Sequence, residues 1–272
     1  MRDGKSSKDK GYEAERPADA PAPFELTPKK VALAAVDWLV RPHAKGPQAR
    51  TYWDHGFDPF LAAVAATAEA EGCDTIVYAL WSHDLRKMKP LNEARVFGST
   101  KKVQTAVLEV IDGEDAWIEV WRRGAAPHCF QQRFTRSSSP PSSKQAFMDG
   151  LPARTFGSTL MMACGETNIV STRRDSDEIV DPFDFRGWLK KKRPRLILNP
   201  SHSYMRRHEM ATKRALYSKG RTLLTVWNRG EKPPESQLPW QAFVDGKDRT
   251  DDIHEVEFAK TSEIRIGVFE LR

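Results

Sequence analysis

The patterned part of the chain opens with two long apolar runs separated by an amphipathic stretch. Residues 30–40 are apolar almost throughout, which is typical of a strand covered on both faces. Asp58 and Pro59 then favour the start of a helix that Gly72 ends, because Asp suits the N-cap, Pro the first turn and Gly the position after the last turn. A second apolar run covers residues 74–81. This strand–helix–strand order predicts a layered α/β architecture.

Downstream, the pattern predicts short strands in the middle of the chain and alternating strands and helices after them. Asp112-Gly113 favours a hairpin turn. A Ser- and Pro-rich segment, residues 136–145, predicts a surface loop or a lid. The expected strands are 103–111, 116–122, 129–135, 157–166, 195–200, 221–227, 256–258 and 264–271, and the expected helices are 182–192 and 206–219.

Residues 1–25 lack apolar periodicity and are rich in Lys, Asp, Ala and Pro. Such a segment cannot bury enough apolar surface to offset its ordering entropy, so we predict a disordered tail over residues 1–25 and one folded domain over residues 26–272. The segment lacks the apolar centre of a secretory signal, and no run approaches the roughly 18 apolar residues of a membrane helix. We therefore expect no membrane partner. Three cysteines without a repeating spacing argue against a disulfide scaffold and favour a cytoplasmic location.

The formal net charge of +6, from 43 Lys and Arg against 37 Asp and Glu, is compatible with an anionic partner without requiring one. Six basic residues lie within residues 186–195. This segment either contacts phosphates, which leaves nucleic acid open as a partner, or forms the exposed end of an amphipathic helix, which is the favoured interpretation. The next predicted helix adds Arg206, Arg207, Lys213, Arg214 and Lys219.

Two further classes of site find no support in the sequence. The seven histidines form no close ligand set, so no metal site is predicted. Glycine-rich phosphate loops are absent, and no cofactor is expected.

Cys164 ends an apolar run and precedes Gly165, so its side chain is expected in the crevice above the end of a strand. A sharp turn of this kind can expose a nucleophile. Taken alone, however, a free cysteine is more often a buried structural residue. Cys73 and Cys129 are both expected to be structural, because one lies between a helix end and a strand and the other in a hairpin strand.

The motifs that follow Cys164 form an ordered series. Cys164-Gly-Glu166 precedes a predicted helix, then Leu-Ile-Leu-Asn-Pro-Ser over residues 196–201, then a helix with Arg214-Ala215 and a strand that ends at Asn228. Over about residues 30–271 this order resembles the nitrilase superfamily of carbon–nitrogen hydrolases. The resemblance implies a four-layer α-β-β-α sandwich, a cysteine nucleophile that attacks a small-molecule amide or nitrile, and assembly into a homo-oligomer.

The resemblance also implies a glutamate that acts as general base and acid and a lysine that stabilises the oxyanion. Leu80 stands where the family has its glutamate, and the nearest titratable substitutes are His83 and Asp84. Arg133 stands where the family has its lysine; it keeps a positive charge with a different donor geometry.

Two more residues are candidates for the same site. Glu166 is either a replacement base or a carboxylate that stabilises the turn. His202 either lines the pocket or belongs to a loop without a role. We therefore predict a catalytic set of Cys164, Glu166 and Arg133, in a pocket with Leu80, His83, Asp84 and His202.

Two function classes remain open at this point. The chain is either a divergent amide- or nitrile-directed cysteine hydrolase, or a catalytically degenerate relative, a pseudoenzyme that keeps the fold as a binding or interaction module. Because Leu80 cannot accept a proton, ordinary nitrilase or amidase turnover is expected to be very weak. The degenerate interpretation is slightly favoured.

Overall fold

The structure is a computed structural model. It describes residues 20–36, 58–80, 91–112, 115–172, 178–201, 208–228, 238–260 and 264–271.

Two β-sheets form the centre of the described part of the chain. The first has the strand order β14 (His254–Val256), β15 (Ile264–Glu270), β1 (Lys30–Val36), β2 (Thr75–Leu80), β3 (Thr105–Asp112), β4 (Asp115–Arg122) and β5 (His128–Gln131). The second has the order β13 (Lys247–Asp248), β12 (Trp240–Val244), β11 (Thr222–Trp227), β10 (Leu196–Ser201), β7 (Thr159–Met161) and β6 (Thr155–Phe156). Each sheet has a parallel centre, β1–β2–β3 in the first and β11–β10–β7 in the second, flanked by antiparallel strands.

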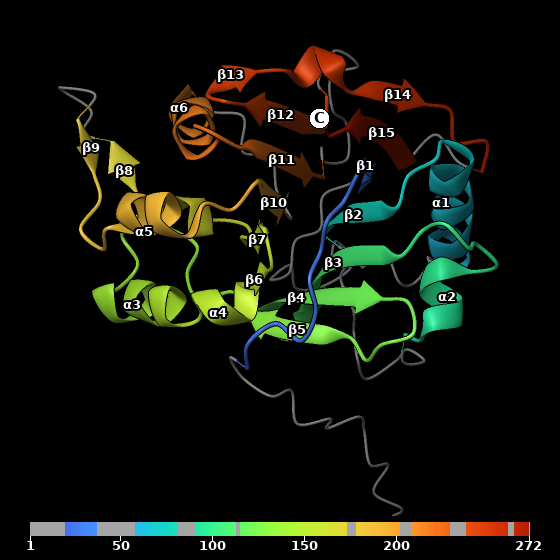
Figure 1. Ribbon diagram of the computed structural model, residues 1–272, viewed down its shortest axis with the longest axis horizontal. Helices are drawn as coiled ribbons and strands as arrows, with labels where there is room; N and C mark the ends of the chain where they lie inside the picture. Colours follow the sequence, from blue (N-terminus) through green and yellow to red (C-terminus); the bar gives the residue numbers. More distant parts are fainter. Residues whose placement is uncertain are drawn as a thin grey trace, which may run out of the picture.

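Helices cover the outer face of each sheet (Figure 1). Those over the first sheet are α1 (Asp58–Ala70) and α2 (Glu93–Phe97), and those over the second are α3 (Pro141–Asp149), α4 (Leu151–Arg154), α5 (Phe185–Lys192) and α6 (His208–Tyr217). A 3-10 helix, Glu166–Ile169, precedes a small hairpin of β8 (Ser171–Thr172) and β9 (Ile179–Val180), and a second 3-10 helix spans Thr250–Asp252. This layering is the four-layer α-β-β-α sandwich that the resemblance implies.

Three apolar layers separate the four layers of backbone. Alternation along β3 shows how one strand serves two of them, because Val107 packs between the sheets while Leu108 packs under the helices of the first sheet. Side chains of β2 and β3 meet those of β10 and β11 across the central layer. The continuous apolar runs predicted strands that are covered on both faces. The structure has this arrangement, since β1, β2, β10 and β11 are buried on both faces.

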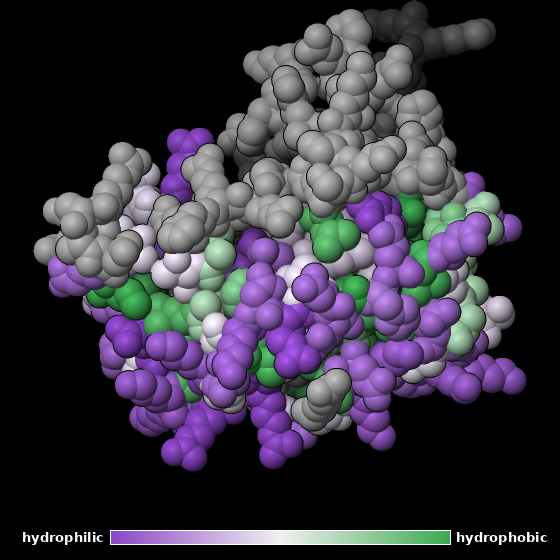
Figure 2. Space-filling model, turned by 90° about the horizontal axis from the view of Figure 1, so that it is seen from above, coloured by the Kyte–Doolittle hydropathy of each residue, from purple (hydrophilic) through white to green (hydrophobic). Residues whose placement is uncertain are grey.

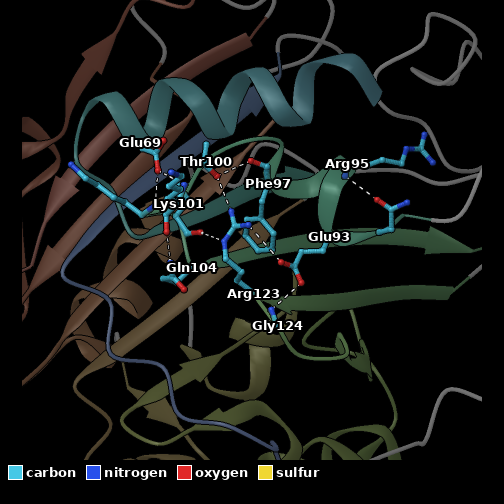
Figure 3. Close-up of polar contacts among 12 residues, drawn as sticks. Glu69, Glu93, Arg95, Phe97, Thr100, Lys101, Gln104, Arg123 and Gly124 are labelled. Carbon is cyan, nitrogen blue, oxygen red and sulfur yellow. Dashed lines mark hydrogen bonds and ion pairs between the residues drawn. The ribbon is translucent and has the colours of Figure 1, made fainter.

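Polar contacts tie the outer helices to the β3–β4 hairpin (Figure 3). Glu69 of α1 accepts hydrogen bonds from the backbone N–H groups of Lys102 and Lys101, which lower the pKa of its carboxyl. The Arg123 guanidinium lies over the Phe97 ring of α2, with Cζ 4.7 Å from the ring centroid. These contacts hold α1 and α2 against the outer face of the first sheet, near the start of β3 and the end of β4.

Several strand boundaries differ from the sequence-based prediction; the strand predicted over 256–258 spans His254–Val256, and two further differences lie near Cys164. The strand predicted over 157–166 ends at Met161, and the strand predicted over 129–135 ends at Gln131. The physical reason is that the Glu166 carboxylate accepts the N–H groups of Ala163 and Arg133, which stabilises irregular backbone beyond both strand ends. Within the predicted loop 136–145, α3 begins at Pro141, because proline is well suited to the first turn of a helix.

Part of the predicted tail lies among the described residues. Of the predicted tail, residues 1–19 lie outside the described residues, whereas residues 20–25 pack on the domain. The backbone N–H of Ala22 donates to Pro152 O at 3.2 Å, and the Phe24 ring lies 5.3 Å from the Phe156 ring. The packed part of the chain therefore begins before residue 26.

The described residues contain neither a helix suited to span a membrane nor a group of side chains suited to hold a metal ion. Their helices include none with the length and apolar character needed to cross a membrane. No group of three or more His, Cys, Asp or Glu side chains within the described ranges is arranged to hold a metal ion. Figure 2 shows hydrophilic side chains over much of the face seen from above, with smaller groups of hydrophobic residues between them.

Candidate functional site

Cys164 lies in a tight turn directly after β7, and β7 is the neighbour of the short edge strand β6. Its side chain is buried, with 4% of its surface exposed. Gly165 has φ +79°, and a Cβ atom at this position would lie 2.5 Å from Thr135 O. Only glycine fits both the left-handed backbone and this close approach. The turn is thus pressed against the loop that follows β5.

Asn199, near the end of β10, holds the turn from the neighbouring strand. Its buried side-chain amide donates to Met162 O at 2.8 Å and to Ala163 O at 3.2 Å. Thr225 of β11 donates from Oγ1 to the Asn199 side-chain oxygen at 3.2 Å. The Asn-Pro-Ser motif therefore fixes the backbone that leads into Cys164.

Glu166 forms an ion pair with Arg154 in which both side chains are fully buried. Glu166 Oε2 accepts from Arg154 Nη1 at 2.6 Å and from the Ala163 N–H at 2.8 Å, while Oε1 accepts from the Arg133 N–H at 2.8 Å. Arg154 also donates from Nη2 to Gln131 O at 2.5 Å. One carboxylate thus joins the turn before Cys164 to the loop after β5.

These contacts define what Glu166 is able to do chemically. Burial raises the pKa of its carboxyl, while Arg154 and the two backbone donors act in the opposite direction. Both oxygens are engaged in holding backbone and a guanidinium. The geometry supports the turn-stabilising interpretation of Glu166 over the role of a replacement base.

Arg133 is held beside the turn by its backbone N–H, which donates to Glu166. The side chain is half-buried, and Nη1 donates to the Gln131 side chain at 3.3 Å. Thr135, two residues after Arg133, lies against Gly165, so the loop after β5 carries the Arg133 guanidinium near the residue that abuts the cysteine turn. The turn that carries Cys164 and Glu166 thus lies against the loop that carries Arg133.

Most of the predicted pocket residues lie outside the part of the chain that the structure describes. His83, Asp84 and His202 lie outside the described residues. Leu80 is described through its backbone, as the last residue of β2, without a described side chain. The predicted pocket therefore stays a prediction.

Two buried charged residues near this region carry no sequence motif that would have selected them. Arg154, in the short helix α4, supplies the counter-charge of Glu166. Glu109 of β3 is a fully buried carboxylate whose backbone pairs in register with Leu80. The only available signal was a single acidic residue within the apolar pattern of β3, which by itself is also compatible with an exposed strand edge.

Of the five basic residues of the predicted helix 206–219, Lys213 and Arg214 are buried and Lys219 is exposed, while Arg206 and Arg207 lie outside the described residues. Lys213 and Arg214 of α6 are buried; Lys213 Nζ donates to the Asn168 side chain at 2.8 Å, and the Arg214 guanidinium lies over the Trp227 ring. Their charges serve internal contacts, since Arg214 reaches β11 of the second sheet and Lys213 reaches the 3-10 helix after Cys164. In α5, Phe185 and Leu189 are buried while residues 190–193 are exposed, as the amphipathic-helix interpretation predicts.

Comparison with known proteins finds similarity in solved structures alone. No protein-family model and no curated protein matches the chain. It is similar to the glutamine-dependent NAD+ synthetase from Acinetobacter baumannii, in complex with adenosine diphosphate, at 10% identity and a TM-score of 0.48, over 90% of this chain and 48% of that one. It is also similar to the glutamine-dependent NAD(+) synthetase from Cytophaga hutchinsonii, at 11% identity and a TM-score of 0.42, over 90% and 43%. The chain spans about half the length of each synthetase, at identities too low to align site residues.

Proposed function

We propose that this protein is a divergent carbon–nitrogen hydrolase that acts on the amide or nitrile bond of a small molecule through Cys164. The observation that carries the proposal is the turn around Cys164. Asn199 holds the carbonyl of Ala163, Glu166 holds its N–H, and Thr135 abuts Gly165. A cysteine whose backbone is fixed in this way is preorganised as a nucleophile.

In the proposed reaction on an amide, the Cys164 sulfur attacks the carbonyl carbon and the C–N bond breaks as the amine leaves. Water then hydrolyses the thioester and frees the cysteine. Glu166 acts as a positioning residue that keeps the turn and the loop after β5 together. The Arg133 guanidinium is the candidate for stabilising the oxyanion.

The first test compares the reactivity of the three cysteines at neutral pH by mass spectrometry after iodoacetamide treatment. We expect Cys164 to be modified faster than Cys73, because burial raises the pKa of the Cys73 thiol to about 12 and leaves it protonated. Modification of Cys164 no faster than that of Cys73 would count against an activated nucleophile.

The second test assays wild type, Cys164→Ala and Cys129→Ala on a panel of small amides and nitriles. Cys129 is half-buried in β5 and outside the turn, so its variant controls for the loss of a thiol. We expect slow hydrolysis in wild type and in Cys129→Ala and none in Cys164→Ala. Equal hydrolysis by wild type and Cys164→Ala would refute the role of this cysteine.

A second candidate function is a binding or interaction module that has lost catalysis. The observation in its favour is that both oxygens of Glu166 are engaged and that Leu80 is apolar, so neither Glu166 nor the position of the family's glutamate supplies an available base. This candidate predicts no turnover in wild type or in Leu80→Glu on the same panel. Hydrolysis by wild type that requires Cys164 would exclude it.

A further inference from the structure

We propose that a basic edge of the second sheet binds the phosphate backbone of a single-stranded nucleic acid. The basic edge is the set of exposed lysine and arginine side chains around the points where β10 and β11 begin. Its members are Lys190, Lys191, Lys192, Arg193, Arg195, Lys219 and Lys247. The proposal does not depend on the function proposed above and concerns a different part of the molecule.

The topology brings three segments of the chain together at this edge. β10 and β11 are parallel neighbours, and their first residues, Leu196 and Thr222, pair in register. Helices α5 and α6 connect to these strands through three and four residues, so both helices end at the edge. The turn between β12 and β13 joins them, because a Cβ atom at Gly246 would lie 3.6 Å from Lys219 Cγ. Lys247 directly follows this glycine.

Cations at the end of a helix often serve the helix itself, by interacting with its last carbonyl groups. In this structure Arg221 has that role for both helices. Its Nη2 donates to Leu189 O at 3.2 Å and its Nη1 to Tyr217 O at 2.7 Å, while Nε donates to Pro194 O at 3.0 Å. Within the described ranges, no hydrogen bond or ion pair engages the seven side chains of the basic edge. Their charges are therefore presented to solvent.

The negative charge near this edge does not balance the positive charge. Within residues 190–195, 219–222 and 245–248 the carboxylates are Asp245 and Asp248. Asp245 accepts the Gly220 N–H at 2.8 Å, and Asp248 accepts the Thr250 N–H at 2.9 Å. A surface that serves only solubility carries both signs interspersed. A concentration of one sign instead indicates an anionic partner.

Two features of α5 favour a nucleic acid among anionic partners. Its consecutive lysines suit a polymer that carries one charge per nucleotide, because each neutralised phosphate releases counterions. Trp188 lies three and four residues before Lys191 and Lys192, on the same side of the helix. Its indole is partly exposed and stacks on Phe185 with an interplanar angle of 9°. A basic track with an accessible aromatic ring binds single strands, whose unpaired bases can stack.

The basic edge and Cys164 lie at opposite ends of the second sheet. β7 and β10 run parallel, and Cys164 follows the end of β7, whereas Arg195 precedes the start of β10. A strand of this length separates the two by roughly 20 Å. Binding at the edge therefore requires no reactive cysteine.

The decisive experiment measures binding of fluorescein-labelled oligo-dT and oligo-U, of about 20 nucleotides, by fluorescence anisotropy. The proteins are wild type, Lys191→Gln/Lys192→Gln and Lys101→Gln/Lys102→Gln, each at several salt concentrations between about 50 and 200 mM NaCl. Lys101 and Lys102 are the matched control, because they are also exposed and adjacent, but lie beside α1 on the other outer face of the sandwich. Both variants lose the same charge.

We expect Lys191→Gln/Lys192→Gln to bind about 10–30-fold more weakly at about 100 mM NaCl. The slope of log K against log salt is expected to fall by about 1.4, or about 0.7 for each lost phosphate contact. Lys219→Gln, on a different segment, is expected to bind about fivefold more weakly. The control variant is expected to stay within about twofold of wild type. Absence of binding by wild type, or an equal loss in the control, would overturn the proposal.

Two further measurements test the identity of the partner. Trp188→Leu is expected to weaken binding at least about fivefold without changing the salt slope, because stacking involves no counterion release. Competition by polyglutamate as effective as by unlabelled oligo-dT would indicate an acidic protein and refute the assignment. Tighter binding of a duplex than of the single strand would refute it as well.

The remaining comparisons identify the strand and separate this proposal from the hydrolase. Equal affinity for oligo-dT and oligo-U is expected if phosphates carry the binding, and a preference for oligo-U would identify RNA through its 2′-hydroxyl groups. Cys164→Ala is expected to bind as tightly as wild type. Turnover without binding removes this proposal and leaves the hydrolase, whereas binding without turnover does the reverse.

Discussion

The Glu166–Arg154 pair shows how much the candidate site depends on one buried contact. Both side chains are fully buried, and the pair also orders the backbone at Ala163 and Arg133. Removing one member leaves the other charge without its partner in a medium of low dielectric constant, which is more costly than replacing both. The same pair therefore governs both stability and the geometry around Cys164.

Arg154→Met is expected to lower the free energy of unfolding by about 3–5 kcal/mol at pH 7. Burial raises the pKa of Glu166, and the variant removes the main group that opposes this shift. An acid with a raised pKa in the folded state binds more protons there than when unfolded, so its contribution to stability falls as pH rises. Urea unfolding at pH 5 and pH 7 is expected to show the smaller loss at pH 5.

The control for this prediction is Arg154→Met/Glu166→Gln, in which no buried carboxyl remains to titrate. Its loss of stability relative to wild type is expected to be smaller than that of Arg154→Met at pH 7, and no larger at pH 7 than at pH 5. An identical loss for the single variant at pH 5 and pH 7 would show that the Glu166 charge is not responsible.

Gly165→Ala tests the turn itself against a matched glycine. Gly165 and Gly124 have φ of +79° and +75°, but a Cβ at Gly124 meets nothing within 4 Å. We expect Gly124→Ala to lower the free energy of unfolding by about 1 kcal/mol because of the left-handed backbone alone. Gly165→Ala is expected to lower it further and to slow Cys164 alkylation. Urea unfolding and mass spectrometry measure both. Equal losses of unfolding free energy would mean that the backbone at Thr135 moves away from an added Cβ atom at no measurable cost.

At the scale of elements, α6 serves to hold the segment after Cys164 rather than to present charge. Tyr217 donates its hydroxyl to Thr167 O at 2.6 Å, and Lys213 reaches Asn168. Burial raises the pKa of the Tyr217 hydroxyl, so it remains a donor throughout the physiological range. The 3-10 helix after the cysteine turn is thus anchored from the outer layer, while Asn199 of β10 holds the backbone before Cys164.

The segment 20–25 is a second element whose packing is testable. Deleting residues 1–19 is expected to leave the melting temperature within about 2 °C of the full chain. Deleting residues 1–25 removes the contacts of Phe24 with Phe156 and Arg122. Loss of a mostly buried aromatic corresponds to about 2 kcal/mol, or a fall of about 4–8 °C. Equal melting temperatures of the two truncated chains would contradict the packing of this segment.

At the scale of the whole molecule, the three apolar layers are coupled because each sheet contributes side chains to two of them. Loss of the central layer exposes the inner face of both sheets at once. We therefore expect the described residues to behave as one structural unit rather than as two halves joined by a linker.

We expect one cooperative unfolding transition for the domain. Circular dichroism at far-ultraviolet wavelengths and the fluorescence of buried tryptophans report on different parts of it, since Trp227 and Trp240 lie in the second sheet and Trp121 in the first. Coincident curves in urea are the expected result. Two separated transitions, with tryptophan variants assigning one to each sheet, would show independent halves.

The sequence by itself determined the elements that depend on local pattern. Continuous apolar runs predicted β1, β2, β10 and β11, because a strand covered on both faces has no polar side to reveal. The pair Cys164-Gly165 predicted a turn, because glycine accepts the left-handed backbone there. These features lie within a few residues of their cause.

Only the tertiary structure decided which distant charges meet. The ion-pair partner of Glu166 is Arg154. The Asn199 side-chain amide on β10 donates to Ala163 O, which follows the neighbouring strand β7, and Lys213 is buried instead of exposed. The register that sets Glu109 beside Leu80 arises from the pairing of β2 with β3. Such contacts depend on sheet order and on the packing of whole layers, and a periodic pattern carries no information on which buried polar groups will find each other.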